Sequence, residues 1–96
     1  MPALDTLLWF QRELSIDEQW TLEGTHHART ANDWLRNQDA NAEPVLAILT
    51  RAYGEHTAAL WRQRWRMFWM ACAETFAYRG GQEWLVAHYR FVRRSR

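Results

Sequence analysis

The spacing of apolar positions changes several times along the chain, and each change marks a predicted element. Asp5 can cap a first short helix that carries leucines and a phenylalanine at helical spacing. Across residues 16–22 apolar and polar side chains alternate, which predicts a strand that ends at Gly24. The helical spacing returns over residues 25–37. The polar stretch 37–43 is predicted to be a loop.

The second half of the chain holds the strongest pattern. Pro44 suits the first turn of a helix that is interrupted at Gly54. Over residues 55–79 aromatic and apolar side chains recur at i, i+4, i+7 and i+8, which predicts one long helix with a wide aromatic face. Residues 80–81 are two glycines that stop this helix. Residues 82–92 are rich in strand formers on both faces, which predicts a last strand.

These elements predict a helix-rich α+β chain in the order helix, strand, three helices, strand. Two strands alone form a marginal sheet that needs further partners. The last strand carries bulky apolar residues on both faces. We therefore expect the chain to form the end of a larger α/β sheet, as one segment spanning residues 1–96.

Composition removes several function classes. Among 96 residues, 12 basic and 11 acidic side chains leave a net charge of +1, so we expect no nucleic-acid partner. The single Cys72 excludes an internal disulfide and a cysteine-based zinc site. No apolar run is long enough to span a bilayer, and no secretory signal is evident, which predicts a cytoplasmic protein. No phosphate-binding glycine loop is present.

The residue types alone offer little chemistry. His26 and His27 are adjacent, and neighbours on a helix point about 100° apart, so the pair is a poor chelate and no metal site is expected. Arginines interleave with Trp61 and Trp65, but helical spacing puts arginines and tryptophans on different faces, which favours an ordinary amphipathic helix. Cys72 lies within the aromatic face, which favours a buried, inert thiol.

Three motifs in register resemble one family. Residues 24–30 followed by Trp34 resemble the pattern G-x-H-Y-A-x-T-x-x-x-W near the C-terminal end of the cyclopropane-fatty-acyl-phospholipid synthases and mycolic acid cyclopropane synthases. Residues 84–92 resemble the final antiparallel strand that closes the methyltransferase sheet of that family. The third motif, Y-x-x-x-C-x-x-x-F in the family, is matched by Phe68, Cys72 and Phe76.

The resemblance implies the C-terminal portion of a class I, Rossmann-like methyltransferase that uses S-adenosylmethionine and bicarbonate on the acyl chains of phospholipids. His27 stands where the family has the tyrosine that contacts bicarbonate, so it is the implied catalytic position. Phe68, Cys72 and Phe76 are the implied wall of the acyl site. The cofactor-binding part would lie upstream, so we expect the chain alone to bind neither cofactor and to be inactive until joined by a methyltransferase core, in cis or in trans.

Two alternatives stay open. A stand-alone helical module could dimerise through its exposed apolar surface, because a long apolar strand on an edge invites pairing with another chain. A binder of the inner membrane face could use the basic end of the chain, since arginines beside tryptophans suit anionic headgroups. The residues of that basic end are Arg93, Arg94 and Arg96.

Overall fold

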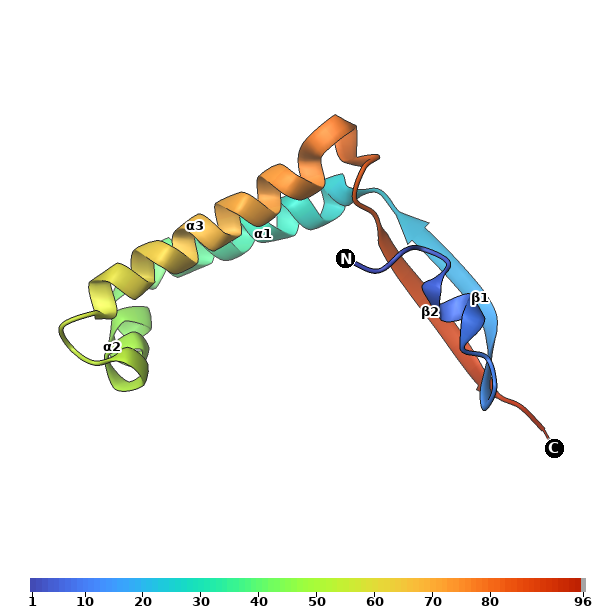
Figure 1. Cartoon of the computed structure of the whole chain (residues 1–96). Coiled ribbons are helices and arrows are strands. Elements are labelled where there is room, and N and C mark those ends of the chain that lie inside the picture. The colour runs from blue at the N-terminus through green and yellow to red at the C-terminus, as the bar shows by residue number, and fades with distance from the viewer. Residues whose placement is uncertain (96) are drawn as a thin grey trace.

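Two arms that meet at an angle make up the molecule in the computed structural model, which describes residues 1–95 (Figure 1). A helical arm holds the three α-helices, and a strand arm holds the two strands together with the N-terminal segment. Arg96 of the predicted basic end lies outside the described residues. The elements in chain order are η1 (Thr6–Trp9), β1 (Leu14–Leu22), α1 (Gly24–Ala40), α2 (Ala42–Tyr53), α3 (Ala58–Ala77), η2 (Tyr78–Gly81) and β2 (Val86–Arg93), η denoting a 3-10 helix.

The predicted fold class is confirmed. The two strands pair antiparallel although about sixty residues separate them, and three α-helices lie between them in sequence. The long predicted helix is present as α3 followed by the 3-10 turns of η2, where Arg79 and Gly80 adopt positive φ angles of 54° and 63°. The last strand was predicted from residue 82 but begins at Val86. Residues 82–85 connect η2 to β2 instead of belonging to the strand.

The alternation predicted for residues 16–22 is wrong near its start. A register shift between Ile16 and Glu18 makes Asp17 a bulge in β1. The bulge brings both acidic side chains to Arg90 of β2. The guanidinium of Arg90 donates to Asp17 over 2.6 Å from Nε and lies 3.1 Å from the carboxylate of Glu18. One arginine therefore holds two residues that strict alternation would place on opposite faces.

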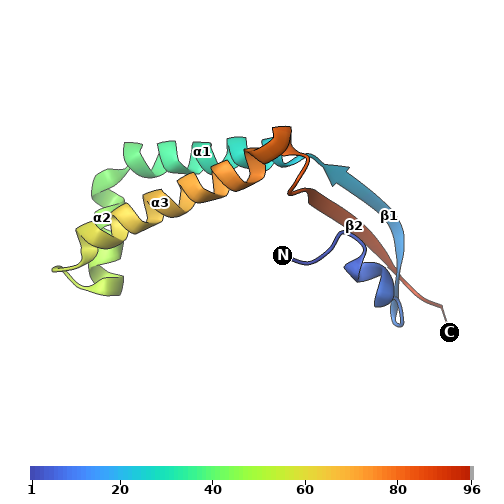
Figure 2. The ribbon, with the colours of Figure 1, turned by 45° about the horizontal axis from the view of Figure 1, so that its top comes forward.

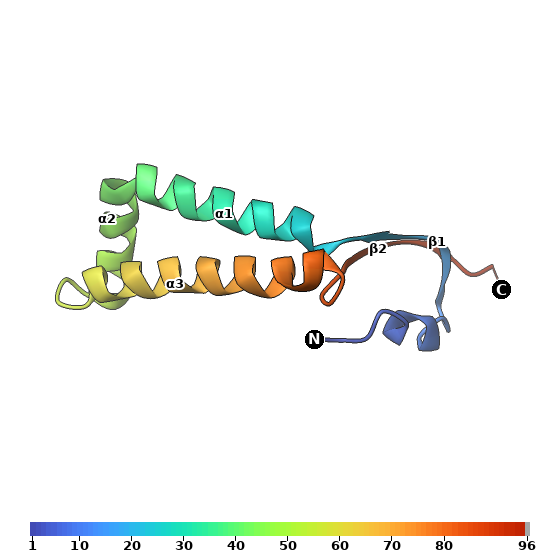
Figure 3. The same ribbon diagram turned by 90° about the horizontal axis from the view of Figure 1, so that it is seen from above.

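Helices α1 and α3 run side by side, and α2 crosses their far end (Figure 3). Apart from Leu49, the apolar side chains buried in this arm are alanines, and Ala31 of α1 is fully buried at 0% exposure. Small residues let two helix backbones approach closely, so the contact forms with little bulky core between them. The buried apolar residues of the described chain are Ala28, Ala31, Leu49, Ala58 and Ala73.

Two further sequence predictions about local structure are wrong. The helix expected from Asp5 shrinks to the four residues of η1, because so short a helix needs a packed face and its apolar side chains are mostly exposed. The N-terminal segment lies beside the strand arm (Figure 2), where the hydroxyl of Tyr89 donates to the carbonyl of Leu4 over 2.5 Å. The loop expected at 37–43 is helical except for Asn41, because its polar side chains bond across to α3.

Candidate functional site

A continuous series of aromatic rings runs along the contact between α1 and α3. Trp69 of α3 is at its centre, with its ring centroid 5.2 Å from that of Trp34 and 5.1 Å from that of Phe68. Trp65 lies 5.6 Å from both Trp69 and Phe68. We call this series the aromatic ladder. Its members are His27, Trp34, Trp65, Phe68, Trp69 and Phe76.

The structure brings two predicted site residues into contact and leaves the others apart. The imidazole of His27 packs edge-to-face on Phe76 with ring centroids 4.3 Å apart, and it lies 5.9 Å from Trp34. Both His27 and Phe76 are half-buried. Within residues 1–95 the ring nitrogens of His27 have no hydrogen-bond partner, so they are free to bond elsewhere.

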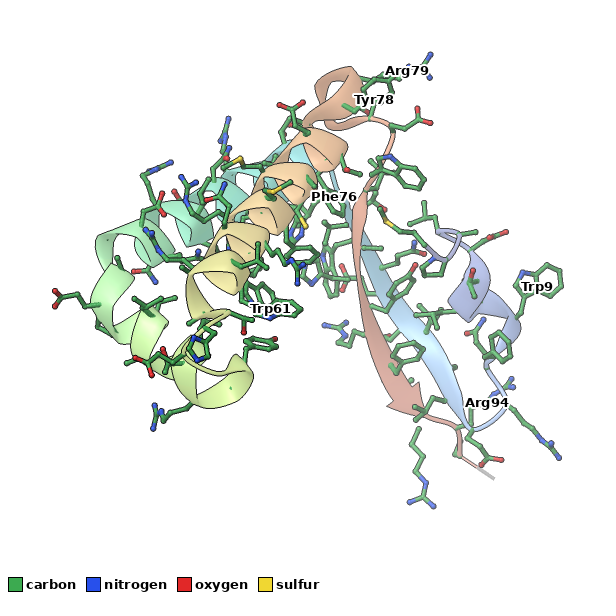
Figure 4. The ribbon with its side chains drawn as sticks, turned by 60° about the vertical axis from the view of Figure 1, so that its left-hand side comes forward. Trp9, Trp61, Phe76, Tyr78, Arg79 and Arg94 are labelled. Atoms are coloured by element: carbon green, nitrogen blue, oxygen red, sulfur yellow. The ribbon has the colours of Figure 1, made fainter. Side chains whose placement is uncertain are left out.

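Phe68 and Cys72 occupy different surroundings on the same helix. Phe68 is 51% exposed and belongs to the tryptophan end of the aromatic ladder, whereas Cys72 is a half-buried free thiol. Phe76 lies near the opposite end of α3 from Trp61 (Figure 4). The predicted stripe is therefore real as a helix face, while its role in holding a substrate stays a prediction.

An open groove of about 580 Å³ lies between the three helices, beside the tryptophan end of the aromatic ladder. Aliphatic side chains of α2 form one side, and carboxamides near the end of α1 form another. Residues with formal charge do not line it. Its lining residues are Trp34, Asn37, Gln38, Asn41, Val45, Ile48, Leu49, Trp65 and Trp69.

A charged cluster ties α1 to α3 next to this groove. Asp39 accepts two hydrogen bonds from Arg66, at 2.7 Å from Nε and 3.1 Å from Nη2, and Arg62 lies 3.6 Å away. The hydrogen bonds from Arg66 lower the pKa of Asp39 below its ordinary value, and the two positive charges act in the same direction. Asp39 thus stays ionised and acts as a clamp between the helices. In the described chain no group of three or more His, Cys, Asp or Glu side chains could hold a metal ion.

Sequence reasoning did not single out Trp34, Trp65 and Trp69 as site residues, nor Gln38. The helical spacing places Trp65 and Trp69 on one face of α3, which was a usable signal. The pairing of Trp69 with Gln38, 31 residues earlier, depends on how α1 crosses α3. The local sequence around either residue does not indicate it.

Comparison with known proteins relates this chain to N-methyltransferases. No protein-family model matches the chain. It is 36% identical to (S)-coclaurine N-methyltransferase of Papaver somniferum, over 98% of this chain and 27% of that protein. N-methyltransferase 4 of the same plant is 34% identical, over 96% of this chain and 26% of that protein. Pavine N-methyltransferase of Thalictrum flavum subsp. glaucum is 30% identical, over 98% and 27%.

A solved structure shows the same likeness. The crystal structure of coclaurine N-methyltransferase bound to N-methylheliamine and SAH matches 95% of this chain and 26% of that one, with 34% identity and a TM-score of 0.81. The chain spans about a quarter of the length of these relatives. It therefore has the architecture of the C-terminal part of a methyltransferase fold. The comparisons support the methyltransferase part of the sequence prediction but not the cyclopropane synthase family or bicarbonate.

Proposed function

We propose that the chain is the acceptor-binding part of an S-adenosylmethionine-dependent N-methyltransferase. The observation that carries this proposal is the match of 95% of the chain, at a TM-score of 0.81, to an N-methyltransferase holding a methylated amine and SAH. When bound, S-adenosylmethionine supplies a methyl group on a sulfonium. The part played by this chain is to bind and orient the amine that takes the methyl group.

The residues of this chain do not fit the cofactor itself. Gly24 is the one glycine of the described chain that lies between a strand and a helix, where a cofactor-binding loop is expected. The carbonyl oxygens of Phe76 and Trp84 fill the space on its Cβ side, so that side is not open to a ligand. We propose that the cofactor site comes from a companion part of the methyltransferase.

The aromatic ladder has the chemistry to hold an amine. Faces of indole and phenyl rings attract an ammonium group within about 6 Å, by roughly 0.5–2 kcal/mol. Trp65 and Phe68 are 36% and 51% exposed, so their rings are accessible to a ligand. His27, whose ring nitrogens are unpaired in the described chain, is our candidate for a hydrogen bond to the acceptor or for taking its proton.

The surface indicates a large partner. The accessible surface is 7628 Å², about 1,800 Å² more than the roughly 5,800 Å² expected for a compact 11.5 kDa protein. The radius of gyration is 18.4 Å, against about 12–13 Å for a compact chain of this length. A standard interface buries about 800 Å² per partner. The excess surface of this chain is larger than that, so it is enough for an extensive interface with a partner.

We propose that the cofactor-binding core of a methyltransferase covers this surface, whether in the same chain or in another. β2 carries apolar side chains on both faces, which is typical of a strand inside a sheet rather than at its edge. β1 is its one partner among the described residues. Large side chains that remain exposed on the two arms would be buried against the core. They include Trp9, Phe10 and Met67; Trp9 projects from the outer side of η1 in Figure 4.

A chimera tests both parts of the proposal. The C-terminal quarter of (S)-coclaurine N-methyltransferase of P. somniferum is replaced by this chain, and methyl transfer from S-adenosylmethionine to coclaurine is measured. We expect turnover above that of the truncated enzyme alone. A chimera that binds SAH in calorimetry but methylates no amine would refute the acceptor-binding role. Methyl incorporation into vesicles of unsaturated phospholipid, in place of the amine, would return the assignment to the lipid acceptor.

Two variants of the chimera locate the acceptor. Phe68→Ala should raise the KM for the amine about 10-fold, since a lost ring contact is worth about 1.4 kcal/mol. Leu60→Ala is the matched control, because Leu60 is also on α3 and is also 51% exposed but belongs to no ring contact. Equal effects of the two changes would contradict a specific role of the aromatic ladder.

Sedimentation of the chain alone as a stable dimer would favour a second copy over the core as the partner.

A further inference from the structure

The orientation of the central ring of the aromatic ladder is held by one amide side chain from the other helix. The indole nitrogen of Trp69 donates to Oε1 of Gln38 over 2.8 Å. Nε2 of the same Gln38 donates to the backbone carbonyl of Arg62 over 3.1 Å. Both polar atoms of the Gln38 side chain therefore bond to α3. Oε1 accepts from Trp69, and Nε2 donates to the carbonyl of Arg62. The side chain is half-buried, where such bonds are shielded from competing water.

Packing alone does not hold these rings. Trp34, Trp65 and Trp69 all border the open groove of about 580 Å³. On the side that faces an open groove, a side chain lacks the packing contacts that lock rotamers in a dense core. An indole N–H that is partly buried also needs a hydrogen-bond partner. The bond to Gln38 meets both needs, since it satisfies the N–H and fixes the plane of the ring.

The effect passes from Trp69 to the exposed rings. Trp69 contacts Phe68 edge-to-face at 5.1 Å between ring centroids and contacts Trp65 at 5.6 Å. A rotation of Trp69 into the groove would remove the surface on which these two rings rest. Phe68 and Trp65 are the exposed members of the aromatic ladder on α3, so their positions shape the wall that a ligand meets on this helix.

We infer that Gln38 is a positioning residue for acceptor binding. It fixes Trp69, and through Trp69 it fixes Trp65 and Phe68. This inference rests on the proposed function, because it assumes that the aromatic ladder contacts the amine. Gln38 itself does not touch the reacting atoms.

Two substitutions in the chimera separate the bonds that Gln38 makes. Gln38→Met keeps the length of the side chain and loses both hydrogen bonds. We expect it to raise the KM for the amine about 5-fold, the equivalent of one hydrogen bond of about 1 kcal/mol, with kcat and the KM for S-adenosylmethionine unchanged. Gln38→Glu keeps an oxygen for Trp69 and should restore most of the affinity for the amine. Asn37→Ala is the control, because Asn37 lines the same groove and its side-chain bond goes to Asn41.

A double-mutant cycle tests whether Trp69 transmits the effect. Trp69→Phe removes the N–H donor, so adding Gln38→Met to it should change the KM no further. A lowered melting temperature with an unchanged KM in Gln38→Met would show a merely structural role and overturn the inference. Additive effects in the cycle would also overturn it. Failure of the proposed function is distinct, since it appears as an unmutated chimera that methylates no amine.

The hydrogen bond can also be observed without activity. In the unmutated chimera labelled on its indole nitrogens, the N–H resonance of Trp69 should move on Gln38→Met and stay in place on Asn37→Ala. A resonance of Trp69 that is insensitive to Gln38→Met would refute the bond itself, whatever the acceptor proves to be.

Discussion

Gly24 is the position at which a single added methyl group tests the junction between the two arms. It is the first residue of α1 and is buried, and it follows β1 after one intervening residue. A Cβ built on it lies under 3.0 Å from the carbonyl oxygens of both Phe76 and Trp84. These two atoms belong to the end of α3 and the approach to β2. Gly24→Ala therefore pushes apart the segments that join the helical arm to the strand arm.

The sign of the stability change decides between two effects. Helix propensity alone favours alanine over glycine by up to about 1 kcal/mol. Overpacking costs about 1–3 kcal/mol, and the upper end applies here because both obstructing atoms are backbone oxygens that cannot rotate away. We expect a net loss of about 2 kcal/mol. For a chain of this size such a loss lowers the melting temperature by about 8–16 °C.

Thermal unfolding of the chain, followed by far-ultraviolet circular dichroism, measures this loss. Gly80→Ala is the control, since Gly80 has a φ of 63° but nothing within 4 Å of its added Cβ. That control should lose about 1 kcal/mol from its backbone conformation alone. A Gly24→Ala chain as stable as the unmutated chain, or more stable, would refute the close approach at the junction.

Three further changes address other contacts. Asp39→Asn should lower the melting temperature at neutral pH; because the pKa of Asp39 is depressed in the folded state, this difference should vanish in a pH series as the pH falls through that pKa. Tyr89→Phe should release the N-terminal segment from its bond at Leu4, seen as faster amide exchange there but not in α1. Ala31→Leu should cost about 1–3 kcal/mol in urea unfolding, since Ala31 is 0% exposed between α1 and α3; an unchanged midpoint would contradict the close helix contact.

The sequence predicted the types of the main elements because their periodicity is strong and local. The aromatic repeat over residues 55–79 predicted α3, and the strand formers after Gly80 and Gly81 predicted β2. The errors fell where a tertiary contact outweighs a local preference. Polar residues 37–43 stay helical because Gln38 and Asp39 find partners on α3. Asp17 and Glu18 meet Arg90 because a bulge breaks the alternation.

The site was predicted in part for the same reason. The spacing of Phe68, Cys72 and Phe76 defines one face of a helix, and that much follows from 3.6 residues per turn. The contact of His27 with Phe76 depends on the angle at which α1 crosses α3. So does the bond from Trp69 to Gln38.

By itself, then, the sequence determined the helices, the strands and the α+β class, because these follow from hydrogen bonds and apolar faces within short segments. The tertiary structure decided which faces meet. It joined two rows of rings into one aromatic ladder, placed an amide across from an indole, and left an excess of surface that the chain cannot bury on itself. Those outcomes depend on helix packing between residues far apart in sequence. The local sequence around a residue does not indicate which distant side chain it will contact.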